Sequence, residues 1–195
     1  MMKQLFRTLS LLLLLWIPTM ATTKQLSDEI EHWQTEEGAD VYFIHAPELP
    51  MVDLLFGLDA GAFRAAEKAG LAQLTASLMT KGAGDYDEEQ FHEALEDLGI
   101  NISAQVSLNQ TLFNLRSLTD EETLSKALDL LALTLSEPHF DAAIFERERA
   151  QSIDAQKALL DNINAVASEL YYETLYPESL LSFTSKELQD SLKSL

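Results

Sequence analysis

The chain has 195 residues, 47% of them hydrophobic, which is enough to bury a sizeable core in one domain and too apolar for wholesale disorder. It contains no cysteine, which excludes disulfides, thiol catalysis and cysteine-based zinc sites. Its formal net charge of −19 argues against binding to nucleic acid, because phosphate contacts require clustered lysine and arginine, and is typical of a solvated surface.

The N-terminal residues have the pattern of a secretory signal peptide. Lys3 and Arg7 precede an apolar segment over residues 9–17, which is far shorter than the roughly 20 residues needed to span a bilayer. Thr19-Met20-Ala21 offers small residues for cleavage after Ala21. We therefore predict a signal peptide over residues 1–21 and a periplasmic or secreted protein with no stable membrane span after cleavage. An uncleaved membrane anchor is the alternative.

Residues 22–195 contain no internal repeat, low-complexity tract or proline- and glycine-rich linker, so we predict a single domain. The first predicted elements are strands over residues 40–45 and 51–58, which follow a polar lead-in over residues 25–37. Two prolines separate these strands. Because proline stays out of the middle of strands, we expect a hairpin-like connection between them.

The middle of the chain shows helical and then strand patterns. Residues 71–79 have leucines at helical spacing, and residues 87–98 form a second amphipathic pattern that ends at Gly99. Alternating apolar and polar residues then predict strands over residues 102–108 and 111–117, with a turn at Asn109-Gln110.

The remainder is predicted to be helical. Thr119 and Glu122 have the spacing of a capping box and open a helix over residues 120–136, whose expected apolar stripe is Leu124, Leu128, Leu131 and Leu135. Two more helices follow, over residues 141–160 and 165–175. This order of elements predicts an α+β fold in which helices cover one face of a largely antiparallel sheet.

Residues 70–82 carry the most informative motif. They read Gly70-Leu71-Ala72-Gln73-Leu74-Thr75-Ala76-Ser77-Leu78-Met79-Thr80-Lys81-Gly82. This segment resembles the active-site helix of the insulinase-like (M16, inverted zincin) metallopeptidases, roughly Gly-Leu-Ala-His-x-x-Glu-His followed by an apolar run and Lys-Gly. Gly61 and the segments 91–101, 136–140 and 145–149 also match the family pattern. The resemblance covers about residues 38–176 and is to the N-terminal half of an M16 domain pair.

The resemblance implies what each motif position does in an active family member. Two histidines at i and i+4 on one helix face bind Zn²⁺ with a later glutamate, and the glutamate between them is the general base for the metal-bound water. Here Gln73 and Ser77 stand in place of the histidines, Ala76 in place of the base and Ala155 in place of the third ligand. Amide and hydroxyl groups are poor zinc ligands, so we expect no catalytic residue, no bound metal and no other cofactor.

These replacements predict an exported, non-catalytic M16-like subunit. Its expected partner is an intact M16 peptidase chain that carries His-x-x-Glu-His, or a second copy of itself, and it would contribute to a peptide-binding chamber. The alternatives are a zinc metalloendopeptidase with substituted ligands, in which Asp154 turns toward the site, a truncated remnant without a biochemical role, and an acidic binding module unrelated to M16.

Two other features bear on these hypotheses. M16 chains pair this half with a second, similar domain, which residues 22–195 lack, so we expect a half-length subunit, a fragment or a truncated product. The four histidines include no pair at i, i+3 or i+4 that one helix would present to a metal. Residues 146–149 (Glu-Arg-Glu-Arg) are interpreted as a solvated helix face, with the alternative that Arg147 or Arg149 contacts a partner.

Overall fold

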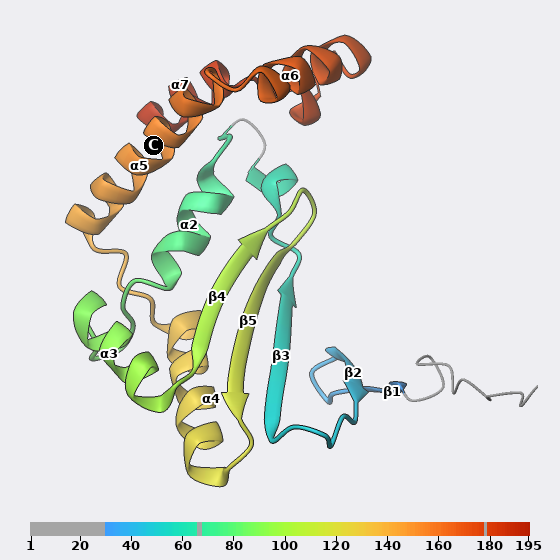
Figure 1. Cartoon of the computed structure of the whole chain (residues 1–195), viewed down its shortest axis with the longest axis vertical. Coiled ribbons are helices and arrows are strands. Elements are labelled where there is room, and N and C mark those ends of the chain that lie inside the picture. Colours follow the sequence, from blue (N-terminus) through green and yellow to red (C-terminus); the bar gives the residue numbers. More distant parts are fainter. Residues whose placement is uncertain (1–29, 66–67, 178) are drawn as a thin grey trace, which may run out of the picture. The chain divides into compact units, whose positions relative to one another are not determined.

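The computed structural model describes residues 30–65, 68–177 and 179–195, which fall into two compact units that divide at Leu49 and Pro50 (Figure 1). In the first unit, β1 (Ile30–Gln34) pairs antiparallel with β2 (Asp40–Ile44). The signal-peptide prediction for residues 1–21 lies outside the described residues. The prediction of one domain over residues 22–195 stays a prediction.

β1 falls within the segment that the sequence indicated only as a polar lead-in. All five of its residues are exposed, so no alternation of buried and exposed side chains marks it as a strand. Cross-strand contacts hold it instead: the ring of His32 stacks on Tyr42 with centroids 4.4 Å apart, and His32 Nε2 lies 3.1 Å from Asp40 Oδ1.

The second unit contains a three-stranded antiparallel sheet in the order β3–β5–β4, formed by β3 (Met51–Leu58), β4 (Asn101–Val106) and β5 (Thr111–Leu118). The expected hairpin between the first two predicted strands is wrong, because β2 pairs with β1 and β3 pairs with β5. Long-range pairing decides the sheet order: Asp53 stands opposite Arg116, and the Nε of Arg116 donates to Asp53 Oδ1 at 2.6 Å.

Helices account for most of the rest of this unit, which confirms the predicted α+β fold with an antiparallel sheet. They are η2 (Ala62–Ala65), α2 (Leu71–Met79), α3 (Glu88–Leu98), α4 (Glu121–Ser136), α5 (Ala142–Leu159), α6 (Ile163–Leu175), η3 (Leu180–Ser182) and α7 (Ser185–Ser194). The capping box predicted at Thr119 is wrong. The carboxylate of Asp120 caps α4 by accepting from the amide of Thr123 at 3.0 Å, whereas Glu122 binds Lys126.

The main core lies between the sheet and helices α3 and α4. Its fully buried residues include Phe91 on α3 and Phe113 and Leu115 on β5. The buried face of α4 consists of Ala127, Leu130, Leu131 and Thr134. The predicted stripe on this helix is therefore partly wrong, because Leu128 is 41% exposed. Leucines occur all round α4, so their spacing alone leaves the rotation of the helix undetermined, and Ala127 and Thr134 share the buried face with two of the leucines.

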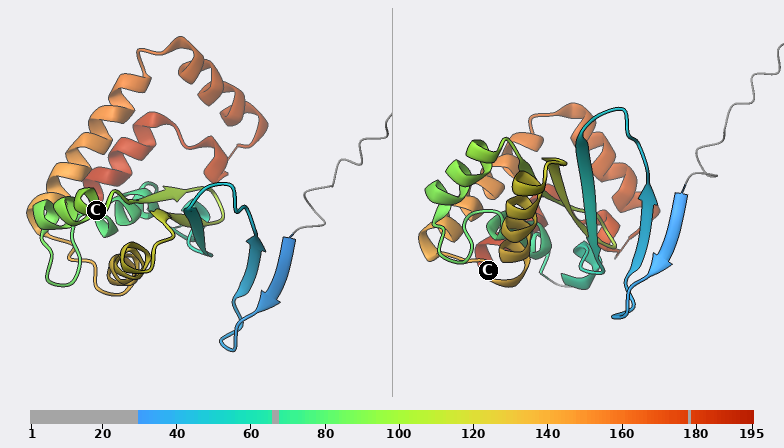
Figure 2. Two further views of the ribbon diagram at one scale, coloured as in Figure 1. Left: turned by 60° about the horizontal axis from the view of Figure 1, so that its bottom comes forward. Right: turned by 90° about the horizontal axis from the view of Figure 1, so that it is seen from below.

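A second core joins α2, α5 and α7, and it sets the position of the motif helix (Figures 1 and 2). Leu74 and Leu78 on α2 pack with Leu192 on α7, and all three are buried. Gly70 caps α2 with φ at +87°, and a Cβ added there would lie 2.7 Å from Leu192 Cδ2. This glycine therefore serves both the left-handed backbone and the close packing of α7.

None of the helices in the described part of the chain combines the length and apolarity required to cross a membrane.

Candidate functional site

The motif helix α2 has two distinct faces. One face lines an apolar pocket of about 250 Å³, which β3, η2 and β5 complete. Its residues share one side of the helix, because they follow the first of them by three, four and seven positions: Ala72, Thr75, Ala76 and Met79. The other face, which carries Gln73 and Ser77, lies at the side of α2 that approaches α5. Because Ala76 follows Gln73 by three residues, it stands at the border between these two faces.

The structure places the four motif positions in different environments. Gln73 on α2 and Ala155 on α5 are exposed, Ser77 is half-buried, and Ala76 is buried at 4% exposure. Ser77 joins this face to α5, because its Oγ donates a hydrogen bond to Glu148 Oε2 at 2.7 Å. Ala155 lies two helical turns further along α5.

Ser77 and Glu148 belong to a charged cluster at the meeting point of α2, α3 and α5. Arg147 donates to both oxygens of Glu88, at 2.8 and 2.7 Å, and to Glu148 Oε1 at 3.1 Å. The Nζ of Lys81, just beyond α2, lies 3.5 Å from Glu88 and 3.6 Å from Glu148. We call these five residues, Ser77, Lys81, Glu88, Arg147 and Glu148, the Ser77–Glu148 cluster.

The Ser77–Glu148 cluster keeps both of its carboxylates charged. Burial by itself raises the pKa of Glu148, but hydrogen bonds from Ser77 and Arg147, with the charges of Lys81 and Arg147, outweigh it and hold that pKa below its ordinary value. Hydrogen bonds from Arg147, followed by its charge and that of Lys81, likewise lower the pKa of Glu88. The paired carboxylates in turn raise the pKa of Arg147.

The interpretation of residues 146–149 as a solvated helix face is wrong for Glu148, whereas the side chain of Arg147 is 43% exposed. Glu148 is only 12% exposed at its side chain, and Arg147 binds carboxylates on α3 and α5. Their partners Glu88 and Ser77 lie 59 and 71 residues away in the sequence, so no local pattern marks them. Glu146 and Arg149 do pair with each other along the helix surface.

The residues at the motif positions do not fit a zinc ion. One amide, one hydroxyl and two methyl groups replace the two imidazoles and two carboxylates of the family pattern, and Zn²⁺ selects imidazole, thiolate and carboxylate. Asp154 does not serve as a substitute ligand in this structure, because its carboxylate pairs with Lys157 at 2.7 Å on the exposed side of α5. Within residues 30–65, 68–177 and 179–195, no three histidine, aspartate or glutamate side chains gather as a metal-binding group. The expectation that the chain holds no zinc stays a prediction.

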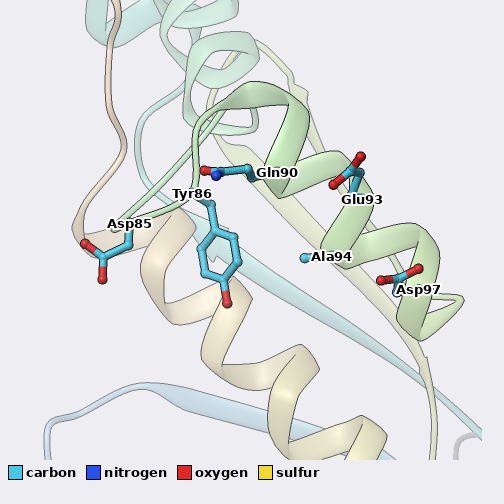
Figure 3. Close-up of a pocket in the computed structure, with 6 residues that line it drawn as sticks. All are labelled: Asp85, Tyr86, Gln90, Glu93, Ala94 and Asp97. Carbon is cyan, nitrogen blue, oxygen red and sulfur yellow. The ribbon is translucent and has the colours of Figure 1, made fainter.

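A second pocket, of about 330 Å³, lies on the outer side of α3 (Figure 3). Glu93 and Asp97 project into it from successive turns of α3, while Asp85 and Tyr86 come from the loop before the helix. Gln90 also lines it but already accepts from the backbone amide of Asp87 in the capping box of α3. The pocket therefore combines three carboxylates with the phenol of Tyr86, and its lining includes no serine, cysteine, threonine or lysine that could act as a nucleophile.

Comparison with known proteins supports the resemblance seen in the motif. The sequence profile of the family described as Insulinase (Peptidase family M16) matches residues 41–185. Over 150 residues the chain is 28% identical to a probable mitochondrial-processing peptidase subunit beta from Arabidopsis thaliana, covering 70% of this chain and 28% of that protein. It is 24% identical over 158 residues to the mitochondrial-processing peptidase subunit beta of Lentinula edodes, covering 76% and 34%.

Solved structures show the same fold. The peptidase M16 inactive domain from Pseudomonas fluorescens superposes with a TM-score of 0.76 at 27% identity, over 85% of this chain and 42% of that one. The periplasmic protease PqqL from Escherichia coli has a TM-score of 0.74 at 16% identity, over 88% and 20%. The chain thus spans less than half the length of each of these proteins. With the family profile matching most of its length, this chain belongs to the insulinase-like peptidase family M16.

Proposed function

We propose that this chain is a non-catalytic member of the M16 family that acts as a subunit beside an intact M16 peptidase chain. One observation carries the proposal: the fold still holds α2 against α5, but Ser77 on that face donates to Glu148 instead of presenting an imidazole to a metal. Gln73 and Ala155 add no zinc-binding group, and Ala76 has no atom that accepts a proton from water.

The relatives give the proposal its context. The curated relatives are named as subunits of a processing peptidase, and the structure from Pseudomonas fluorescens is described as an inactive domain. Both descriptions apply to those proteins. They support a model in which an inactive M16 chain contributes to the assembly formed by an active one.

The sheet offers a way for such a subunit to hold a peptide. β4 pairs with β5 on one side only, so its other edge carries backbone groups without a strand partner among the described residues, and α2 runs close to it (Figure 1). Asn101, Ser103 and Gln105 alternate as exposed residues along this strand. An extended peptide would add to this edge through main-chain hydrogen bonds, which require no catalytic group.

Export is part of the proposal and rests on the signal-peptide pattern of residues 1–21 alone. An exported chain should begin at Thr22, and N-terminal sequencing of the protein from the extracytoplasmic fraction tests this. A chain that retains residues 1–21 and stays with the membrane would support the anchor alternative.

Affinity purification of the full chain from its own cells tests the subunit role. We expect an M16 chain with an intact His-x-x-Glu-His motif to co-purify in about equal amounts, with zinc in that chain, and peptide cleavage by the mixture to exceed that of the partner alone. A chain that purifies alone, binds zinc and cleaves peptides would establish the substituted-ligand metallopeptidase instead. A chain that purifies alone without zinc or activity would favour the remnant or the acidic binding module.

A further inference from the structure

Helix α6 is turned with its apolar side toward solvent. Four large apolar residues share one face of the helix, because they lie seven, eight and twelve positions after the first. They are Ile163, Leu170, Tyr171 and Leu175, with exposed fractions of 82%, 59%, 59% and 50%. We call these four residues the α6 face. None of the 13 residues of α6 is buried. An amphipathic helix that packed on its own core would show the opposite orientation.

One side of α6 is partly buried, and it combines Glu169 with small and apolar side chains. Glu169 projects from the helix opposite the α6 face, and its carboxylate accepts hydrogen bonds from the backbone amide of Ser185, at 2.9 Å, and from the Ser185 hydroxyl. Asn162 caps the start of the helix by accepting from the amide of Asn164 at 3.0 Å. The Glu169 bonds tie this side of α6 to α7, and the α6 face on the opposite side is exposed.

The charge around the α6 face has one sign. The sequence has no lysine, arginine or histidine between Lys157 and Lys186, and the exposed residues Asp161 and Glu173 stand beside the face. Two copies of such a surface repel each other, as do two chains of formal net charge −19. A complementary surface would carry apolar side chains fringed by lysine and arginine.

We propose that the α6 face is the docking surface for the partner chain, and that the partner presents an apolar patch with a basic rim. This inference rests on the proposed subunit function and adds where the partner binds and by what chemistry. Tyrosine and leucine anchors supply the apolar contact, while Asp161 and Glu173 steer the basic rim and reject a second copy of this chain.

The test uses the full chain and a defined probe, a fluorescently labelled amphipathic helical peptide of leucine and lysine. We compare the wild type with a double variant, Leu170→Gln with Tyr171→Gln, and with a control, Leu49→Gln with Leu55→Gln. The original side chains of the control are 65% and 66% exposed and lie outside α6 in the sequence. Loss of the α6 pair should weaken binding about tenfold or more, while the control binds as the wild type does, and added salt should weaken all binding.

Three outcomes would overturn the inference. Equal binding by both variants would mean that the peptide recognises net acidity rather than the α6 face. A dimer in sedimentation that the α6 variant abolishes would make a second copy the occupant. Binding to phosphatidylcholine vesicles that is lost in the α6 variant would make it a lipid-facing helix.

The outcome for the subunit role is separable from these. If an M16 chain co-purifies equally well with the wild type and the α6 variant, the subunit role stands and the docking surface is wrong. If the α6 variant loses the basic peptide but no M16 chain co-purifies with the wild type, the docking chemistry stands and the proposed function is wrong.

Discussion

At the scale of single residues, the position that would carry a metal-binding histidine has become part of an ion-pair cluster. The hydroxyl of Ser77 satisfies one oxygen of the nearly buried Glu148, and Arg147 and Lys81 satisfy the other. Glu148 would otherwise be a buried carboxylate without enough donors, which is a costly arrangement. The replacement of a histidine at position 77 is thus accommodated by contacts within the molecule.

The first prediction concerns the Ser77 hydroxyl. Ser77→Ala removes one donor from Glu148 and should lower the free energy of unfolding by about 1–2 kcal/mol, because the carboxylate stays desolvated. Ser136→Ala is the matched control, since Ser136 Oγ donates to the Ala132 carbonyl at 2.8 Å on the exposed end of α4 and should cost at most about 0.5 kcal/mol. Equal losses in urea unfolding would show that the Ser77 hydrogen bond has no special weight.

The second prediction concerns the acid limit of stability. The folded-state pKa values of Glu88 and Glu148 lie below their ordinary values, so their contribution is complete above the unfolded pKa of about 4.3 and is lost as pH falls through the folded pKa. Arg147→Met should therefore be less stable than the wild type near neutral pH, and the difference should shrink in acid. Urea midpoints measured between about pH 7 and about pH 3 test this. A difference that stays constant would assign the effect to packing of the Arg147 stem.

At the scale of elements, local patterns predicted the strands and helices that carry their own signals. The spacing of leucines predicted α2 with its observed bounds, and alternation predicted β5 to within one residue. The exposed strand β1 was not predicted, because it lacks alternation. Helix α7 was not predicted either, although Thr184 and Glu187 have the spacing of a capping box and Leu188 and Leu192 lie four residues apart. The Ser77–Glu148 cluster joins three helices, and no local pattern could reveal it.

The third prediction tests the observed rotation of α4. Leu130 is 5% exposed and Leu128 is 41% exposed, although both lie in the same leucine-rich helix. Leu130→Ala should lower the free energy of unfolding by about 2–4 kcal/mol, because it leaves a cavity in the main core, and Leu128→Ala by less than about 1 kcal/mol. The reverse order in thermal or urea unfolding would mean that α4 presents its other side to the sheet.

The fourth prediction tests how α7 fixes the start of the motif helix. Gly70→Ala adds a methyl group at a residue with a left-handed backbone and places that group against Leu192. It should lower the free energy of unfolding by more than about 1–2 kcal/mol. Gly99→Ala is the control, because Gly99 also has a positive φ, at +62°, but has no atom within 4 Å of an added Cβ. Gly70→Ala should cost more than Gly99→Ala, because it adds the packing cost against Leu192 to a larger backbone strain at φ of +87°. Identical losses in unfolding free energy would remove α7 from this role.

At the scale of the whole molecule, the fold of the family is present, and we propose that its zinc chemistry is not. The frame of an M16 domain is present, from the capped motif helix to the antiparallel sheet, and this could be anticipated from the glycine and leucine spacing of the sequence. The docking surface that we propose could not be anticipated, because a sequence pattern does not reveal which side of α6 meets solvent. The assembly, rather than the isolated chain, is where we expect peptide cleavage.

The most direct test of a non-catalytic M16 chain is zinc binding by the purified full-length protein at neutral pH, measured by calorimetric titration and by metal analysis after dialysis. The account predicts that the wild type retains no zinc. The variant that combines Gln73→His, Ser77→His and Ala155→Glu should bind one zinc per chain, because these changes restore the ligand set of the family. One zinc per wild-type chain, lost on Gln73→Ala or Ser77→Ala, would contradict the account and make this protein a metallopeptidase with substituted ligands.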